Sequence, residues 1–312
     1  MKTNPNSGRK VGYFAGMRFV RGGRFLMGSE RFYADEAPVR PATVGDFWMD
    51  EIPVTNAEFA RFVAATGHVT FAEIAPDPRD YPGMDPALAQ PGSIVFSPPA
   101  RPVPLNDSTA WWRFLLGADW RRPLGAEGPP GREDHPVVHV AISDAQAYAA
   151  WAGKALPTEA EFEYAARGGL DGAEYAWGDE LEPGGLPRAK IFHGEFPWRN
   201  DAPAGLERTS PVRSYPANAY GLFDLIGNVW EWTEDWYDSA KPAGAPRCCG
   251  EGLRGTPEGS ADPGSGTPRK VTKGGSHLCA PSYCQRYRPA ARYPQPVDTT
   301  TSHLGFRCVV RP

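Results

Sequence analysis

Apolar and polar residues alternate with helical spacing after Thr55. Thr55 and Glu58 form the Ser/Thr-x-x-Glu pattern in which two side chains cap the first turn of a helix. Phe59 and Phe62 then fall on one face of that helix, and Gly67 is a residue type at which helices commonly end. The pattern predicts an amphipathic helix between Thr55 and Gly67.

Two further capping signatures predict two more helices. Ser143 with Gln146 marks the start of one, and Thr158 with Glu161 marks the start of another. Near the N-terminus, apolar residues at 17–20 and 25–27 flank a Gly-Gly pair, a combination that suits a tight turn with positive φ. We therefore also expect a β-hairpin there.

Most of the remaining sequence is rich in proline and glycine. Among 312 residues there are 35 Gly and 34 Pro, too many for a helical bundle, and 12% aromatic residues, too many for a disordered chain. We expect one α+β domain over residues 12–312, with little regular structure, preceded by a flexible tail at 1–11. The Pro/Gly stretches cover residues 75–106, 122–134, 179–188 and 239–270, and the last is expected to be a surface excursion.

Charge and cysteine content narrow the function classes. The formal net charge is -4 without a basic block, so we expect no nucleic-acid partner. No apolar run of about 18 residues is present and the first residues are polar, so we expect neither a membrane span nor a signal peptide. Five cysteines, including the adjacent pair Cys248-Cys249, favour a reducing cytoplasm over a disulfide scaffold.

Two of the cysteines lie five positions apart in KGGSHLCAPSYCQRYRPAARY, residues 273–293. On a helix, Cys279 and Cys284 would project about 140° apart, and on a strand they would face opposite sides. Pro281 restricts the backbone between them, so a bend can bring the two thiols together. The pair could then form a disulfide, a metal clamp or a redox couple.

Thiolates are soft ligands that select Cu(I), zinc or iron–sulfur clusters. A closed zinc site needs four ligands. His277 and Cys308 could be added, but no second closely spaced ligand pair completes a familiar zinc pattern. Two sulfurs alone suit Cu(I), which accepts low coordination.

Several segments together resemble the formylglycine-generating enzyme family, also called sulfatase-modifying factors, in its bacterial cytoplasmic type. The matching stretches are DHPVVHV (134–140), WAGKALPTEAEFEYAARGG (151–169), AKIFHGEFPW (189–198), YGLFDLIGNVWEWTEDWY (220–237), KGGSHLCAPSYCQRYRPAAR (273–292) and HLGFRC (303–308). The cysteine segment is the most specific, because the others also occur in relatives with different chemistry. The fold that this resemblance implies is the family's variant of the C-type-lectin-like fold, a single α+β domain.

The resemblance also implies an activity. Cys279 and Cys284 would hold Cu(I), and the cysteine of an unfolded sulfatase, in a Cys-x-Pro-x-Arg motif, would complete the site. With O2 and an external thiol reductant, that cysteine would become Cα-formylglycine. The alternatives are a catalytically inactive peptide-binding relative, an iron-dependent sulfoxide synthase and a plain structural disulfide. The first is disfavoured because both cysteines are present, and the second because no His-rich helical domain is seen.

Neighbouring positions match the family's site less specifically. Ser276 and Tyr283 match hydroxyl residues beside the copper, and Trp230 matches an indole that shields the oxygen pocket. Thr300 and His303 match positions that line the peptide groove. Each has a simpler interpretation, since a serine after Gly-Gly is often a turn residue and a tryptophan is most often part of the core.

The resemblance implies one calcium site and the loss of another. Asp224 and Glu231, with the carbonyls of Gly227 and Val229, offer the oxygen ligands that Ca²⁺ takes, unless the two acids merely cap a turn. At the family's first calcium site this chain has Lys190 and Ala204, and we expect the Lys190 ammonium to replace the ion.

The remaining implications concern thiols and assembly. Cys308 and the position of Pro289 belong to disulfides in extracytoplasmic members of the family. Here the partner of Cys308 is absent and Pro289 replaces a cysteine, so Cys308 is expected to be a buried free thiol in a cytoplasmic monomer.

Overall fold

The structure is a computed structural model that describes residues 14–203, 205–238 and 255–312. The tail predicted at 1–11, Ala204 and Cys248-Cys249 lie outside the described residues, as does much of the 239–270 stretch. The helices are α2 (Asn56–Thr66), α3 (Ile142–Trp151) and α4 (Glu159–Arg167). The longest of them has 11 residues, and none of the described helices is long and apolar enough to cross a membrane.

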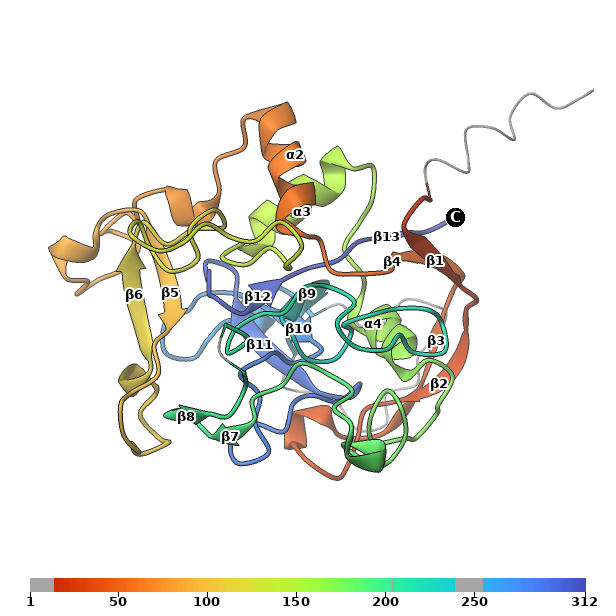
Figure 1. The fold of residues 1–312 in the computed structure, drawn as a ribbon. Coiled ribbons are helices and arrows are strands. Elements are labelled where there is room, and N and C mark those ends of the chain that lie inside the picture. Colours follow the sequence, from red (N-terminus) through yellow and green to blue (C-terminus); the bar gives the residue numbers. More distant parts are fainter. Residues whose placement is uncertain (1–13, 204, 239–254) are drawn as a thin grey trace, which may run out of the picture.

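A four-stranded sheet at the centre of the molecule carries the cysteine segment (Figure 1). Its strands lie in the order β11-β10-β9-β12, with β10 antiparallel to both neighbours and β12 parallel to β9. The cysteines lie on the loop that follows β10, the second strand in that order. The bounds are β9 (Trp230–Trp236), β10 (Arg269–Lys273), β11 (Arg292–Pro296) and β12 (Leu304–Gly305).

Smaller sheets surround this centre. One has the order β1-β4-β13, and three antiparallel ribbons pair β2 with β3, β5 with β6 and β7 with β8. In Figure 1 the β5–β6 and β2–β3 ribbons lie at opposite ends of the molecule. The bounds are β1 (Met17–Val20), β2 (Gly23–Met27), β3 (Arg40–Val44), β4 (Phe47–Asp50), β5 (Gly92–Phe96), β6 (Trp112–Leu116), β7 (Gly194–Glu195), β8 (Arg199–Asn200) and β13 (Val309–Val310).

Two of the three predicted capping boxes are confirmed. Thr55 caps α2 reciprocally with Glu58, and Thr158 caps α4 reciprocally with Glu161. The third helix exists, but its predicted cap is wrong. Helix α3 begins after Ala141, whose N–H donates to Asp144 Oδ2 at 2.9 Å, so the predicted cap residue Ser143 lies inside the helix.

The predicted N-terminal hairpin is also wrong. Strand β1 pairs with β4, and β2 pairs with β3, so the two halves of the predicted hairpin belong to different sheets. Gly22 does not form a tight turn. A Cβ there would lie 2.4 Å from the carbonyl oxygen of Val44, so glycine is required for the close crossing of two chain segments.

The core is rich in aromatic residues, as the composition predicts. The larger cluster includes the fully buried side chains of Phe59, Phe162, Trp232 and Phe306. A smaller cluster, which we call the aromatic wall, includes Phe96, Trp111, Phe192, Phe196 and Leu278. Leu278 belongs to the cysteine segment, so the wall packs directly against the candidate site.

Candidate active site

The turn between β10 and the first cysteine depends on two glycines. Gly274 and Gly275 have φ values of 91° and 73°, in the region that other residues rarely adopt. A Cβ at Gly274 would lie 2.6 Å from the carbonyl oxygen of Leu225, and one at Gly275 would lie 2.5 Å from that of Arg286. The glycines therefore let the segment pass between two other stretches of backbone.

The two cysteines converge as the sequence predicts. A turn at residues 281–283 separates them, and the Cys284 N–H donates to the Ala280 carbonyl at 3.0 Å. Their Sγ atoms lie 3.4 Å apart as free thiols. Cys279 is buried and Cys284 is half-buried, so one sulfur is held in the core and the other is nearer to solvent.

The surroundings make the two sulfurs unequal. Burial raises the pKa of Cys279 well above its ordinary value. The pKa of Cys284 is lowered, first because it accepts a hydrogen bond from Cys279 and further by the N–H and guanidinium of Arg286. Proton loss therefore begins at Cys284, which becomes a thiolate that accepts a hydrogen bond from the Cys279 thiol.

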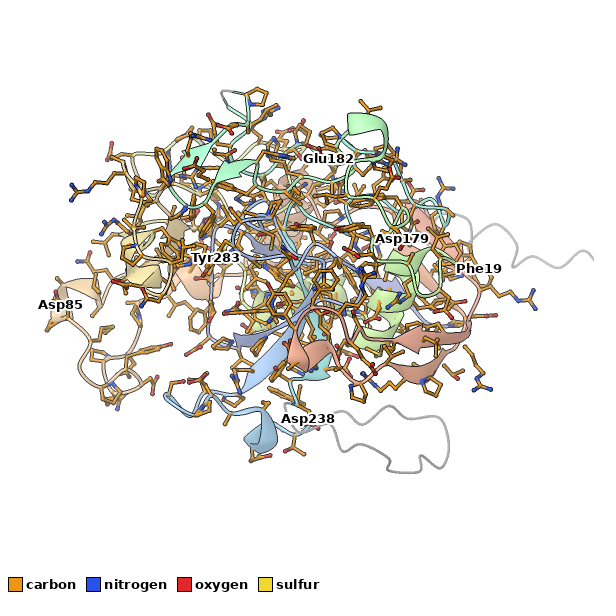
Figure 2. All side chains as sticks on the ribbon, turned by 90° about the horizontal axis from the view of Figure 1, so that it is seen from below. Phe19, Asp85, Asp179, Glu182, Asp238 and Tyr283 are labelled. Atoms are coloured by element: carbon orange, nitrogen blue, oxygen red, sulfur yellow. The ribbon has the colours of Figure 1, made fainter. Side chains whose placement is uncertain are left out.

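Tyr283 directly precedes Cys284 in the chain and is 41% exposed. It is labelled in Figure 2. Its ring stacks on Phe196 with centroids 4.4 Å apart and planes 5° apart, and its edge meets Trp111 at 5.8 Å. The aromatic wall thus fixes this exposed ring next to Cys284. Tyr283 is therefore accessible from solvent, and a role for it in a reaction stays a prediction.

Ser276 and Trp230 have clear structural roles. Ser276 is fully buried, and its carbonyl accepts from the Cys279 N–H at 3.0 Å while its Oγ accepts from the Leu278 N–H at 3.2 Å. Trp230 belongs to the same core cluster as Cys279, and its N–H donates to the His303 carbonyl at 2.8 Å. Ser276 thus contacts the backbone of Cys279, and a role for either Ser276 or Trp230 in a reaction stays a prediction.

Thr300 lines a cavity of about 390 Å³ between the β5–β6 ribbon and the short turns that follow α2. Most of its lining is apolar, and Asp298 is the one acid among the described lining residues. His303 is not part of the lining, but its ring lies 4.9 Å from that of Trp112, which is. Thr300 therefore borders a cavity, and His303 packs against Trp112 behind the lining. That these two residues line a peptide groove stays a prediction.

A buried chain of hydrogen bonds fixes which way the Thr300 hydroxyl points. Burial lowers the pKa of His139 to about 3, so this imidazole is neutral. Its Nε2 lies 3.0 Å from the carbonyl oxygen of Pro123 and must donate to it, so Nδ1 accepts from Ser93 Oγ at 2.7 Å. Ser93 Oγ lies 2.7 Å from Thr300 Oγ1, and with its own proton committed it can only accept. The Thr300 hydroxyl therefore donates to Ser93, so toward any other partner its oxygen can only accept.

Comparison with known proteins identifies the family. The sequence profile described as "Sulfatase-modifying factor enzyme 1-like domain" matches residues 4–312. The chain belongs to the sulfatase-modifying factor family.

Two curated relatives illustrate the similarity within the sulfatase-modifying factor family. A formylglycine-generating enzyme of Mycobacterium tuberculosis is 53% identical, covering 93% of this chain and 96% of the relative. Another from Streptomyces coelicolor is 47% identical, covering 92% and 86%. A solved structure of PvdO from Pseudomonas aeruginosa, 23% identical, covers 94% of this chain and 93% of that chain with a TM-score of 0.58, which shows the fold alone. The mixed α+β fold is thus confirmed, and its relation to C-type lectins stays a prediction.

Both acids of the candidate calcium loop, Asp224 and Glu231, already have hydrogen-bond partners within the protein. Glu231 is fully buried, and its two carboxylate oxygens accept from Arg307 Nε at 2.7 Å and Nη2 at 2.8 Å. Asp224 Oδ2 accepts from the Arg213 N–H at 2.7 Å. Burial raises the pKa of both acids. The donor types fit Ca²⁺, but Arg307 neutralises one of the two negative charges.

At the other predicted site, Lys190 is buried and its Nζ donates to the backbone carbonyl of Leu206. Burial also lowers the pKa of this lysine. A backbone carbonyl bound by the ammonium is the contact expected if Lys190 replaces an ion, although Ala204 lies outside the described residues. Cys308 is fully buried and free, which confirms that prediction.

Sequence reasoning missed three arginines that follow the cysteines. Arg286, Arg288 and Arg292 each bind the segment around Asp35 and Glu36, about 250 positions earlier in the chain. Within the described residues, no group of three or more His, Cys, Asp and Glu side chains is arranged to hold a metal. The thiols are therefore a pair and not part of a larger ligand cluster.

Proposed function

We propose that this chain oxidises a cysteine of an unfolded sulfatase polypeptide to Cα-formylglycine, within a Cys-x-Pro-x-Arg motif. The observation that carries the proposal is the pair of free thiols 3.4 Å apart, in a chain that is 53% identical to a formylglycine-generating enzyme over most of its length. In the balanced reaction, one peptide thiol, one O2 and two reductant thiols yield an aldehyde, hydrogen sulfide, water and a disulfide.

The two sulfurs fit Cu(I) by their chemistry. Both are soft ligands, they face each other, and Cys284 is already disposed toward the thiolate form. Bound by Cys279 and Cys284, Cu(I) would supply the oxygen activation that protein side chains do not provide. Because the described residues offer a pair and no larger cluster, a further ligand would come from the client cysteine.

The chain's own residues orient the client and keep water away. The aromatic wall supports Tyr283 on the accessible side of Cys284. In this position the Tyr283 ring would shield the sulfurs from water, and a peptide would approach from the exposed side of Cys284. An extended peptide that continues to the cavity would meet an apolar lining, the acceptor Thr300 and the carboxylate of Asp298. Apolar and cationic side chains of the client suit those groups.

We further propose one weak Ca²⁺ site in the loop of residues 224–231 and none at Lys190. Supporting the first are two buried acids on one short loop, and supporting the second is the buried ammonium bound to a backbone carbonyl. We also propose a cytoplasmic monomer that draws electrons from a thiol reductant. The three described cysteines are all free, as expected in a reducing compartment.

A peptide conversion assay tests the function. The protein is supplied with Cu(I), a thiol reductant and O2 and is offered Leu-Cys-Thr-Pro-Ser-Arg, with the same residues in scrambled order as the control peptide. We expect an aldehyde, trapped by an aldehyde-reactive probe, in the motif peptide alone. Binding of both peptides without any aldehyde would instead favour an inactive peptide-binding protein.

A further inference from the structure

The segment from Phe32 to Glu36 packs against the residues that immediately follow Cys284. It contains the short turn Ala34–Glu36, and Tyr33 lies just before that turn. The hydroxyl of Tyr33 accepts from the N–H of Gln285, the next residue after Cys284, at 3.1 Å. We call residues 32–36 the clamp.

Glu36 makes the most buried contact of the clamp. Its side chain is fully buried, and its two oxygens accept from Arg288 Nη1 at 2.7 Å and Nη2 at 2.6 Å. Arg288 Nε in turn donates to the Gln285 carbonyl at 2.7 Å, and its guanidinium lies 3.7 Å from the ring centroid of Phe32. Glu36 therefore reaches the backbone next to Cys284 through one rigid, planar group.

Asp35 adds a second connection. Its carboxylate accepts from Arg286 Nη1 at 3.1 Å, and the Arg286 guanidinium lies 3.9 Å from the ring centroid of Tyr33. The Asp35 carbonyl also accepts from Arg292 Nη1 at 3.4 Å. The clamp thus holds the chain at several points between Gln285 and Arg292.

Cys279 is held by different parts of the protein. Its carbonyl accepts from the Phe192 N–H at 2.9 Å, and its side chain is part of the main core. The aromatic wall and the core therefore fix one sulfur, whereas the clamp fixes the backbone that carries the other. The distance between the two sulfurs depends on both supports.

We infer that the clamp is a positioning element, which holds Cys284 beside Cys279. The two sulfurs can then bind one soft ion, or one reagent that reacts with two thiols, together. The inference rests on the proposed function for its biological purpose. Its physical content, a preorganised pair of thiols, concerns the metal-free protein and can be measured without a client peptide.

Phenylarsine oxide, which binds two neighbouring thiols at once, is the probe. Its affinity for the metal-free protein is compared in the parent, Glu36→Gln and Asp35→Asn, together with the affinity for Cu(I) in competition with a chromophoric chelator. Glu161→Gln is the matched control. Glu161 also forms a bidentate pair, with Arg311 at 2.7 Å for both bonds, and that pair includes no residue of the cysteine segment.

We expect Glu36→Gln to bind phenylarsine oxide about ten-fold more weakly or worse, because a disordered pair must be ordered on binding. Glu161→Gln should stay close to the parent, and alkylation should still count the same number of thiols in every variant. Asp35→Asn changes a less buried pair, and it keeps the test decisive if Glu36→Gln does not fold.

Affinities in both clamp variants within two-fold of the parent would overturn the inference. If the clamp has a merely structural role, Glu36→Gln and Glu161→Gln should both have a lower melting temperature, and their affinities for phenylarsine oxide should be equal. If the parent fails to convert the peptide but the clamp variants still bind phenylarsine oxide more weakly, the clamp inference is supported and the proposed function is refuted.

Discussion

Replacing Arg307 by methionine tests the charge balance of the calcium loop. Arg307 is fully buried and forms the bidentate pair with Glu231, and its Nη2 also donates to the Phe223 carbonyl at 2.9 Å. Arg307→Met therefore leaves the Glu231 carboxylate buried without its partner. Breaking one side of a buried ion pair costs about 3–5 kcal/mol of unfolding free energy. A domain of this size then melts roughly 6–20 °C lower, at about 2–4 °C per kcal/mol.

The pH dependence of this loss has a definite sign. Burial already raises the pKa of Glu231, and Arg307 is the strongest influence that opposes it. Without Arg307 the folded-state pKa rises further above the unfolded one, so the penalty is present at high pH and shrinks as pH falls through the folded-state value. The stability gap between variant and parent should therefore narrow toward acid pH.

Calorimetry in a chelating buffer from neutral to acid pH measures both effects. Glu231→Leu combined with Arg307→Met should recover part of the stability, because it removes the unpaired charge. Added Ca²⁺ should raise the melting temperature of Arg307→Met more than that of the parent, since Asp224 and Glu231 then lack their nearest cation. An unchanged melting temperature in Arg307→Met would refute the ion-pair reasoning, and an equal response to Ca²⁺ would refute the calcium assignment.

Three further predictions address the thiols, the cavity and the lysine. The pH at which iodoacetamide begins to alkylate Cys284 should be lower in the parent than in Cys279→Ala, because loss of the Cys279 hydrogen bond raises the pKa of Cys284. Identical pH profiles of alkylation in the two proteins would contradict this. Thr300→Val should raise KM for the motif peptide several-fold at unchanged kcat, since one acceptor contributes about 1 kcal/mol, whereas an unchanged KM would show that the hydroxyl does not meet the peptide. Calcium titration by calorimetry should detect at most one site, and two tight sites would show that Lys190 does not replace an ion.

Local signals in the sequence predicted local structure well. The capping boxes at Thr55 and Thr158 require residues three positions apart, and the structure contains both. The bend between Cys279 and Cys284 depends on a proline inside the same short segment, and it too is present. In these segments the interacting residues are neighbours in the chain, and their chemistry predicted the contact. The same kind of signature failed at Ser143 and Gln146, because α3 begins earlier, after Ala141.

Local sequence patterns did not predict contacts between segments that are distant in the chain. The Gly22 position resembled a tight turn, but its conformation depends on the carbonyl of Val44, which approaches from another strand. The cap of α3 depends on Asp144, whose carboxylate also accepts from the backbone N–H of Phe71. The bidentate pair of Glu36 with Arg288 spans most of the chain and carries no local signature.

The central claim is that Cys279 and Cys284 together convert a client cysteine to formylglycine. Mass spectrometry of the motif peptide, after incubation with Cu(I), reductant and O2, tests it most directly in the parent, Cys279→Ser, Cys284→Ser and Cys308→Ser. We predict the thiol-to-aldehyde mass change with the parent and with Cys308→Ser, whose residue is a buried thiol outside the pair. Neither variant of the pair should produce it. Conversion that persists in either of them, or that is absent from the folded, copper-loaded parent, would contradict the account.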